Sequence, residues 1–323
     1  MKLFVTGAAG FIGSNYVRRV LATTDDQITV YDALTYAGNE ATLRDLESDA
    51  RYLFVKGDIR DRDAVTRAME GHDAVVHFAA ESHVDRSIVN PDDFVSTNCL
   101  GTNVMCDVAH RVGVERFVHI STDEVYGSIE QGSFSEQDRL CPRSPYSASK
   151  AGSDLIALSY LETYGLPVIV TRSSNNFGPF QFPEKVIPLF VTNLIEGTKV
   201  PLYGDGLNVR DWCYVDDNCD GVDLVLRKGT VGEIYNIGAG NEITNRELTD
   251  RILASLGAGH DMIEYVEDRL GHDRRYSIDC AKVRALGWQP AHELSEALQA
   301  TVAWYRDNRW WWEPLKATQE STE

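Results

Sequence analysis

The chain of 323 residues has no long hydrophobic run and few positive charges. No apolar stretch approaches the roughly 20 residues that a membrane-spanning helix needs. The first residues, MKLFVTG, reach a glycine before a signal-peptide core could form. Lys and Arg total 31 against 49 Asp and Glu, and the formal net charge of -18 would repel a polyanion over most of the surface. We therefore expect a cytoplasmic protein that binds neither a membrane nor nucleic acid, although a small anionic substrate would fit a cleft where basic residues gather.

Paired cysteines and metal-ligand spacings are also lacking. No two cysteines form a Cys-x-x-Cys pair, and none lies at zinc-ligand spacing from a histidine. We expect no metal site and interpret the cysteines as reduced thiols that act as small buried side chains. They are Cys99, Cys106, Cys141, Cys213, Cys219 and Cys280. Internal repeats are absent as well, which excludes a repeat architecture.

Short β-branched runs alternate with longer helical stretches over the first half of the chain. Near-continuous apolar strands of this kind are typical of a parallel sheet that is covered on both faces. The pattern predicts a doubly wound, Rossmann-like α/β fold. The expected strands are 3–6, 28–31, 52–56, 74–78, 117–121 and 168–172, and the expected crossover helices include 12–21, 64–70 and 93–112.

A further helix is expected over 146–164, because Ser144 can cap it, Pro145 fits its first position and Gly165 can end it. After residue 172 the sequence becomes richer in loops. We therefore expect a Rossmann domain over 1–172, a smaller mixed α/β domain over 173–316 with some segments returning to the first, and a flexible tail over 317–323.

Three glycines and a distant aspartate indicate a dinucleotide site. Gly7, Gly10 and Gly13 lie between the first strand and the first helix, where they let the backbone approach a pyrophosphate at the helix N-terminus. Asp32 closes the second strand, 19 residues beyond Gly13, near the position of a carboxylate that binds the adenosine ribose. A carboxylate there would repel a 2′-phosphate, which favours NAD over NADP. The alternative is a tight turn followed by a solvated aspartate.

Tyr146 and Lys150 lie one helical turn apart on one face of the expected helix. A tyrosine has an ordinary pKa of about 10, so it can act as a base at neutral pH only beside positive charge. Lys150 and an oxidised nicotinamide would supply that charge. A Tyr and a Lys at this spacing occur by chance on many helices, but this pair directly follows the fifth strand, whose carboxyl end faces the ligand.

Two adjacent acids follow the fifth strand in the sequence Ser121-Thr122-Asp123-Glu124. Neighbouring side chains of a strand point to opposite faces, so Asp123 and Glu124 can serve one site only if the strand has already ended. Two carboxyl groups in a cleft can take different protonation states, one an acid and the other a base. An isolated Asp-Glu pair most often lies in a solvated loop. Because the nucleotide and tyrosine motifs accompany the pair here, we favour the interpretation that both acids serve one site.

These residues resemble the extended short-chain dehydrogenase/reductase superfamily and, more narrowly, the dTDP-glucose 4,6-dehydratase family. The narrower resemblance rests on LTYAGN at 34–39, HFAAESHVDRS at 77–87, TDEVYG at 122–127, YSASK at 146–150, NNFGP at 175–179, NVRDW at 208–212 and GHD at 271–273. It covers nearly the whole chain, to about residue 316. Its most specific element is the Thr-Asp-Glu triplet combined with the tyrosine motif.

The resemblance implies a reaction in three steps. Tyr146 would take the C4 hydroxyl proton of the hexose while hydride passes to NAD, with Thr122 bound to the C4 oxygen and Lys150 lowering the tyrosine pKa. Glu124 would then remove the C5 proton, and Asp123 would protonate the departing C6 hydroxyl. The hydride finally returns to C6, so no net redox change remains. Asp123 must therefore stay protonated, and we expect burial and the Glu124 charge to raise its pKa.

The resemblance also implies two sets of ligand contacts and a homodimer. NAD would contact Gly7, Gly10, Phe11, Ile12, Gly13, Asp32, Leu34, Thr35, Gly38, Asp58, Ile59, Ala79, Ala80, Thr97, Ser121, Tyr146, Lys150 and Asn176, although Asp58 could equally begin a turn. The nucleotide sugar would contact Ser82, Thr122, Asp123, Glu124, Asn175, Lys185, Pro201, Tyr203, Arg210, Asn245, Asp268 and His272. The dimer would pair helices 93–112 and 146–164, whose apolar residues could instead be covered wholly by the sheet.

Two other functions use parts of the same pattern. A nucleotide-sugar 4-epimerase would also hold NAD and use Tyr146, but it would not need Asp123 and Glu124. A non-catalytic NAD-binding sensor could keep the fold, although an intact Thr122, Tyr146 and Lys150 argue against it. The preference for thymidine over uridine rests on the resemblance alone.

Overall fold

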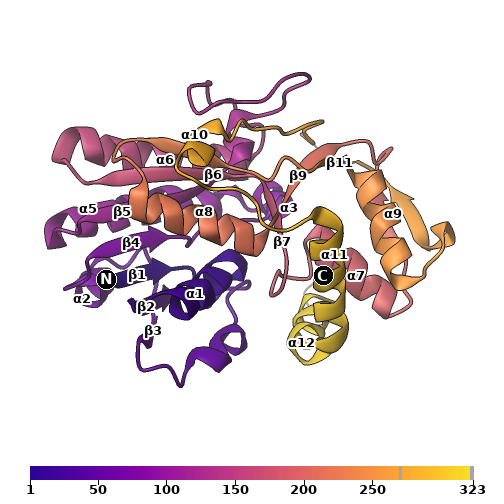
Figure 1. Ribbon diagram of the computed structural model, residues 1–323, viewed down its shortest axis with the longest axis horizontal. Helices are drawn as coiled ribbons and strands as arrows, with labels where there is room; N and C mark the ends of the chain where they lie inside the picture. Colours follow the sequence, from indigo (N-terminus) through magenta and orange to yellow (C-terminus); the bar gives the residue numbers. More distant parts are fainter. Residues whose placement is uncertain (269–270, 321–323) are drawn as a thin grey trace.

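The computed structural model describes residues 1–268 and 271–320, and a seven-stranded parallel sheet forms its centre (Figure 1). The strands run in the order β10-β6-β5-β4-β1-β2-β3, and all neighbours pair in parallel. Their bounds are Lys2–Thr6 (β1), Gln27–Asp32 (β2), Tyr52–Lys56 (β3), Ala74–His77 (β4), Arg116–Thr122 (β5), Val168–Ser173 (β6) and Ile234–Ile237 (β10). All six expected strands are present, and the predicted fold class is confirmed.

Helices cover both faces of this sheet and create two apolar cores. The helices α1 (Phe11–Thr23) and α8 (Val215–Lys228) pack on one face, with Val17, Val20 and Val222 in the core. The other face is covered by α2 (Arg62–Met69), α5 (Thr102–Val112) and α6 (Pro145–Tyr164). Among the described residues, no helix combines the length and the apolar character needed to cross a membrane.

Helix α6 begins and ends as the sequence predicts. The Ser144 hydroxyl accepts from the Ser147 amide at 3.1 Å, and the Ser147 hydroxyl accepts from the Ser144 amide at 3.1 Å, which completes a capping box. Pro145 occupies the first turn, and Gly165 ends the helix in the left-handed conformation with a φ of 73°. This start places Tyr146 and Lys150 in the first turns of α6.

The expected helix over 93–112 is not a regular α-helix. The structure divides this region into α4 (Pro91–Phe94), a π-helix η2 (Val95–Gly101) and α5. A Cβ on Gly101 would lie 2.4 Å from the Ile59 side chain, so the chain approaches its neighbour closely here. Asn98 accepts from the Glu81 amide at 2.8 Å and donates to the Ser149 hydroxyl at 2.8 Å. The wider turn thus joins the segment after β4 to α6, and such turns are frequent at functional sites.

The second part of the chain forms smaller sheets and a third apolar core. One sheet has the order β11 (Glu242–Thr244), β9 (Val209–Tyr214) and β7 (Asn175–Phe177), and the other pairs β12 (Ile263–Val266) with β8 (Val200–Tyr203). The core lies between them, α7 (Val186–Ile195), α9 (Asn245–Leu256), α11 (Leu294–Asp307) and α12 (Arg309–Glu320). The shorter helices are η1 (Glu40–Leu46), α3 (Val84–Val89), η3 (Asp123–Tyr126), η4 (His260–Met262) and α10 (Ala281–Ala285).

Two features of the second part bear on the expected domain organisation. The short strand β10 returns to the large sheet beside β6, and α8 packs on α1, as the expectation of returning segments allows. Residues 317–320 of the expected tail continue α12, and residues 321–323 lie outside the described residues. The division at residue 172 itself remains a proposal.

Helix α12 connects the two parts of the chain. The Trp311 indole donates to the Thr42 hydroxyl on η1 at 3.0 Å, and the Lys316 ammonium donates to the Asn193 side chain on α7 at 2.9 Å. Figure 1 shows α12 beside α11 below the smaller sheets. The packing of this amphipathic helix explains why a polar sequence is nevertheless ordered there.

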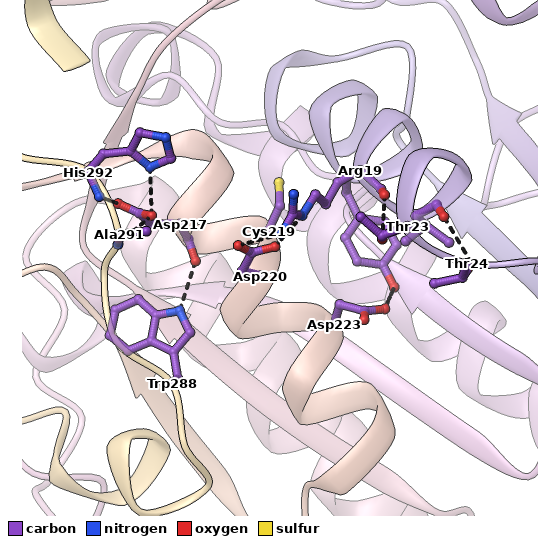
Figure 2. A network of polar contacts seen from close by, with 12 residues as sticks. Arg19, Thr23, Thr24, Asp217, Cys219, Asp220, Asp223, Trp288, Ala291 and His292 are labelled. Atoms are coloured by element: carbon purple, nitrogen blue, oxygen red, sulfur yellow. Dashed lines mark hydrogen bonds and ion pairs between the residues drawn. The ribbon is translucent and has the colours of Figure 1, made fainter. Parts of the chain in front are cut away.

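Helix α8 makes polar contacts with two segments that are distant from it in the sequence (Figure 2). On one side, Asp220 pairs with Arg19 of α1. On the other, the backbone carbonyl of Asp217 accepts from the Trp288 indole at 2.9 Å, and its buried carboxylate meets the His292 ring at 2.8 Å. The second part of the chain is therefore joined to the Rossmann sheet through polar contacts as well as apolar packing.

A buried ion pair lies beneath the start of α6. The Asp154 carboxylate accepts from the Arg172 guanidinium at 2.9 Å and lies 3.3 Å from the His119 ring, and all three side chains are almost fully buried. Burial alone would raise the Asp154 pKa, but His119 and Arg172 hold it below the ordinary value of 3.8. A depressed carboxyl pKa means that this group stabilises the fold above the ordinary pKa and loses that contribution as the pH falls.

We expect the substitution Asp154→Asn to lower the free energy of unfolding by about 3–5 kcal/mol, because it leaves Arg172 charged and uncompensated in the interior. Urea unfolding at neutral pH measures this loss. The matched control is Asp45→Asn, which removes an exposed partner of Arg18 and should cost about 1 kcal/mol or less. Equal losses of unfolding free energy in the two variants would contradict the larger contribution to stability expected of the buried pair.

Candidate active site

The glycine loop after β1 leaves no room for side chains. A Cβ on Gly7 would lie 2.5 Å from the Ala79 amide nitrogen, and one on Gly13 would lie 2.7 Å from the Gly7 carbonyl oxygen. Gly7 also has a φ of 70°, which glycine adopts without strain. Helix α1 follows directly, and no side chain caps its first turn, because the N-cap residue is Gly10. The loop and the helix terminus thus form a cradle suited to a pyrophosphate.

Asp32 lies beside this cradle at the end of β2. Its two carboxylate oxygens accept from the Ala9 amide at 2.9 Å and the Leu34 amide at 2.8 Å. A Cβ on Gly38 would lie 2.9 Å from the carboxylate, so the 34–39 segment folds closely around it. Burial raises the Asp32 pKa, and the two amide bonds oppose that shift. Each oxygen keeps a second lone pair, so the carboxylate can still accept from a ribose hydroxyl.

The other predicted cofactor residues follow neighbouring strands of the same sheet. Ala79 follows β4 and touches the glycine loop, whereas Ser121 lies near the end of β5. Thr97 lies on the π-helix η2. The Asp58 carboxylate after β3 is paired with Arg60 at 2.6 Å. Because the carboxyl ends of parallel strands share one edge of the sheet, these residues lie around a common site; their individual contacts to NAD remain predictions.

Strand β5 ends at Thr122, so Asp123 and Glu124 lie in the 3-10 turn η3. The Thr122 hydroxyl accepts from the Glu124 amide at 3.2 Å and lies 3.3 Å from an Asp123 carboxylate oxygen. Glu124 lines the central cavity, whereas Asp123 is only 3% exposed. The strand has therefore ended where the sequence required, and the turn brings both acids to the same edge of the sheet.

The environment of Asp123 favours its protonated form. Burial raises the pKa of Asp123 well above the ordinary value of 3.8, and the charges of Glu124 and Asp211 act in the same direction. Arg210 opposes the shift. The Oδ2 atom has no hydrogen-bond partner among the described residues. An aspartate in this setting can hold a proton near neutral pH and donate it, as the sequence analysis expected.

Tyr146 and Lys150 lie in the first turns of α6, close to the acids. Burial raises the pKa of Tyr146, and Glu124 and Asp123 raise it further, while hydrogen bonding by Thr122 lowers it. The Lys150 ammonium donates to the Ile120 carbonyl at 2.7 Å, and burial lowers its pKa to about 8. Burial and the two carboxylates dominate the raised pKa of Tyr146, and the expected lowering of that pKa by Lys150 remains a prediction.

A cavity of about 1140 Å³ adjoins these residues. Ten of the predicted cofactor and substrate residues line it, namely Ser82, Glu124, Asn175, Asn176, Lys185, Pro201, Tyr203, Arg210, Asn245 and His272. Asp268 does not line the cavity, but it meets the His272 ring at 2.6 Å. The cavity therefore brings together predicted residues from the Rossmann sheet and from the smaller sheets.

Lys185 and Arg210 are the two cationic contacts predicted from the sequence, and they line the cavity together with Arg86 and five acidic residues, Glu81, Asp85, Asp93, Glu124 and Glu184. The Lys185 ammonium donates to the Ser82 carbonyl at 2.8 Å. The largely buried Arg210 guanidinium donates to the Asp273 carbonyl at 2.8 Å and lies 4.1 Å from the centre of the Tyr276 ring. Both residues are placed where a diphosphate entering the cavity could meet them.

Several cavity residues were not identified from the sequence. They include Tyr36, Glu81, Arg86, Phe182, Glu184, Trp212 and Leu315. Tyr36, Arg86 and Trp212 belong to the motifs that carry the family resemblance, and that membership is the signal that could have found them. Leu315 gave no signal, because it lies on α12 at the far end of the sequence.

Metal ligands and disulfides do not contribute to this region. Over residues 1–268 and 271–320, no group of three or more His, Cys, Asp or Glu side chains is arranged to hold a metal ion. The six cysteines are free thiols, and four of them are buried. The polar groups around the cavity are thus carboxyl, hydroxyl, phenol, amide and basic side chains.

Comparisons with known proteins agree with this arrangement. The family model described as GDP-mannose 4,6 dehydratase matches residues 4–301. A dTDP-glucose 4,6-dehydratase of Streptomyces antibioticus is 59% identical, and the match covers 98% of this chain and 96% of that protein. DesIV, a dTDP-glucose 4,6-dehydratase of Streptomyces venezuelae crystallised with NAD and dTDP, is 56% identical with a TM-score of 0.96, and the match covers 98% of this chain and 100% of that one.

The epimerase fold is close as well, but its sequence is more distant. A UDP-glucose 4-epimerase of Thermotoga maritima matches with a TM-score of 0.89 and 30% identity, over 96% of this chain and 100% of that one. The higher identity and the Asp123–Glu124 pair both favour the dehydratases. The chain belongs to the family described as GDP-mannose 4,6 dehydratase and, within it, to the dTDP-glucose 4,6-dehydratases of the extended short-chain dehydrogenase/reductase superfamily.

Proposed function

We propose that this chain is an NAD-dependent hydro-lyase that converts dTDP-glucose into dTDP-4-keto-6-deoxyglucose and water. The observation that carries the proposal is the Thr122-Asp123-Glu124 turn, which places a buried acid with a raised pKa and a second carboxyl group next to Tyr146. The names of the dehydratases with more than half of their residues identical support the same activity.

The glycine cradle and Asp32 fit NAD, because Gly7 and Gly13 let the loop pack tightly against the start of α1 and the segment after β4, where any Cβ would clash with the backbone. NAD held there would supply both the acceptor for the C4 hydride and the donor of a hydride to C6, so the overall reaction would be redox-neutral. The Asp32 carboxylate would accept a hydrogen bond from the adenosine ribose. Its negative charge disfavours a 2′-phosphate at the same position.

Oxidation at C4 depends on the first turns of α6. Tyr146 takes the proton of the C4 hydroxyl, and the Thr122 hydroxyl hydrogen-bonds the C4 oxygen. A tyrosine can take that proton only when positive charge offsets nearby carboxylates. Lys150 supplies this charge from one helical turn away, because it is largely protonated below its pKa of about 8. A protonated Asp123 also helps, since it removes one of the two negative charges that oppose ionisation of Tyr146.

Elimination depends on the unequal protonation of the two acids. The C4 ketone acidifies the proton on C5, and ionised Glu124 removes it as a general base. Asp123 gives its proton to the C6 hydroxyl, which then leaves as water, and C5 is reprotonated when the hydride adds to C6. The structure supports this division of roles, because Asp123 is the more buried acid and its pKa is raised.

The nucleotide part of the substrate occupies the side of the cavity built by the smaller sheets. Lys185 and Arg210 meet the diphosphate, and Tyr203 on β8 offers a partly exposed ring on which a base can stack. The remaining contacts are proposed for Ser82, Asn175, Pro201, Asn245, Asp268 and His272. The choice of thymidine rather than uridine follows the names of the relatives.

The direct test is product identification. Incubation with dTDP-glucose and no added reductant should yield a 4-keto-6-deoxy sugar, detected by its absorbance in alkali and by mass spectrometry as the loss of one water. A parallel incubation with UDP-glucose measures the nucleotide preference. Recovery of dTDP-galactose would favour the epimerase, and absence of turnover with retention of NAD would favour the non-catalytic sensor.

The substitution Asp123→Asn separates elimination from oxidation. We expect single-turnover elimination to slow by about 10²–10⁴-fold, the usual contribution of a general acid, while initial C4 oxidation changes much less. Reduced nicotinamide should accumulate, and its near-ultraviolet absorbance measures this. Equal slowing of both steps would contradict the role assigned to Asp123.

The same variant should be at least as stable as the wild type at neutral pH. A carboxyl whose pKa is raised by folding disfavours the native state once the pH exceeds its ordinary pKa, because the unfolded chain can ionise and the folded chain cannot. Asparagine does not titrate and removes that cost. A urea midpoint below that of the wild type at neutral pH would contradict the raised Asp123 pKa.

We also propose a homodimer formed through η2 and α6. Val95, Leu100 and Leu155 on these elements are more than half exposed, so the sheet does not cover all of their apolar residues. An open cleft of about 510 Å³ lies between Val95, Leu100 and Ile156. An isologous contact of this face with a second copy would bury it. A cytoplasmic location is likewise proposed from the acidic composition and the free thiols.

The substitution Leu155→Glu tests this dimer. A charge at the centre of the apolar face should shift the monomer–dimer equilibrium toward the monomer, which sedimentation velocity over a range of concentrations measures. The control is Leu53→Glu, an exposed apolar residue on β3, at the opposite part of the sheet. A wild-type chain that sediments as a monomer, or a Leu155→Glu variant that stays dimeric, would rule out this interface.

A further inference from the structure

Tyr36 belongs to the 34–39 motif, and the proposed reaction gives it no role. The structure places it in the wall of the central cavity, together with Ser82 and Glu124. Its hydroxyl oxygen is inaccessible to solvent and has no hydrogen-bond partner among the described residues. A buried hydroxyl without a partner costs free energy, and a ligand that supplies the missing hydrogen bond recovers it.

Residues from two other loops hold the Tyr36 ring in place. The Arg86 guanidinium lies 3.8 Å from the ring centre, and the Phe182 ring meets it edge-on at 5.7 Å between centres. Arg86 is in turn paired with Glu184 at 3.1 Å. The loop after β2, the helix α3 and the loop before α7 thus converge on one phenol. This packing fixes the direction of the hydroxyl before any ligand binds.

The Tyr36 hydroxyl stays protonated over the physiological range. Burial raises its pKa, and the negative charges of Glu184 and Glu81 act in the same direction, while Arg86 opposes them. The group can therefore donate one hydrogen bond and accept others. It has no capacity to act as a base in the reaction, so its contribution is to binding.

The position of the phenol is close to the reacting residues. The Ser82 side chain acts on the phenol oxygen and lowers the pKa of Tyr36, although the pair falls outside the geometry of a full hydrogen bond. Tyr36 also contributes to the raised pKa of Tyr146, which places the two phenols within electrostatic range. Tyr36 lines the same cavity as Glu124, the residue proposed to remove the C5 proton of the hexose.

The reaction proposed above leaves two ring hydroxyls without a protein partner. Tyr146 and Thr122 engage the C4 oxygen, and Asp123 engages the C6 hydroxyl, which leaves those at C2 and C3. We propose that Tyr36 is a further substrate-binding residue, whose hydroxyl hydrogen-bonds the C2 or C3 hydroxyl of the hexose and is held in place by Arg86. This inference rests on the proposed function, because it concerns the same cavity and the same sugar.

The substitution Tyr36→Phe removes only the hydroxyl and keeps the ring that packs on Arg86 and Phe182. Because the hydrogen bond is present in both the bound substrate and the transition state, we expect KM for dTDP-glucose to rise about tenfold with kcat changed less than about threefold. The matched control is Tyr16→Phe. This fully buried tyrosine on α1 bonds Asp223 at 3.3 Å, and it does not line the cavity.

Two substrate analogues identify the hydroxyl that Tyr36 binds. The ratio of KM between variant and wild type is measured with dTDP-2-deoxyglucose and dTDP-3-deoxyglucose. It should fall to about one with the analogue that lacks the partner hydroxyl and stay near ten with the other. This substrate-dependent loss would not arise from a general disturbance of folding.

Three outcomes would overturn the inference. They are a Tyr36→Phe KM equal to that of the wild type on dTDP-glucose, a penalty that persists with both analogues, and loss of co-purified NAD with no change in KM, which would assign the hydroxyl to the cofactor. A wild-type chain that does not convert dTDP-glucose would overturn the proposed function, and this inference with it.

Discussion

The parallel pairing of the central strands is the constraint on which the site depends. Parallel strands must all begin at one edge of the sheet and end at the other, so whatever follows β1, β2, β4 and β5 is delivered to the same edge. The glycine cradle, Asp32, the cavity segment after β4 and the Thr122 turn are four such continuations. Their proximity needs no special contacts among them, because the backbone hydrogen bonds of the sheet impose it.

The chemistry requires one carboxyl group to remain neutral beside another that ionises. Burial achieves this at Asp123, and the neighbouring negative charges increase the effect. Burial also opposes ionisation of Tyr146, whose pKa is raised. The buried Asp154–Arg172 pair under α6 shows the alternative solution, in which opposite charges keep a carboxylate ionised. Both aspartates are buried, so the opposite shifts of their pKa values come from the charges of their neighbours and not from the depth of burial.

Local sequence signals predicted the elements that are determined locally. The Ser144 cap, the helix end at Gly165 and the glycine turn after β1 each follow from a few neighbouring residues, and the structure contains all of them. The end of β5 at Thr122 was also predictable, because the two acids could share a site only if the strand stopped there. The residues proposed as catalytic could therefore be named from the sequence, and their proposed roles come from the family resemblance.

The features that escaped prediction depend on distant parts of the chain. The π-helix η2 arises where Gly101 meets Ile59 and Asn98 meets both Glu81 and Ser149, and no local pattern encodes those contacts. The raised pKa of Tyr146 depends on burial of its side chain in the folded protein. The unpartnered hydroxyl of Tyr36 emerges only when Arg86 and Phe182 are seen against its ring.

Helix α12 has a consequence for the order in which the molecule is completed. The cofactor cradle uses residues from the first strands, whereas the wall of the substrate cavity includes Leu315 on α12. During synthesis on the ribosome, the residues of the nucleotide cradle emerge long before those of α12. The emerging chain therefore holds all the residues of its glycine cradle before α12 can complete the wall of the substrate cavity. This order allows the cofactor to bind before the substrate.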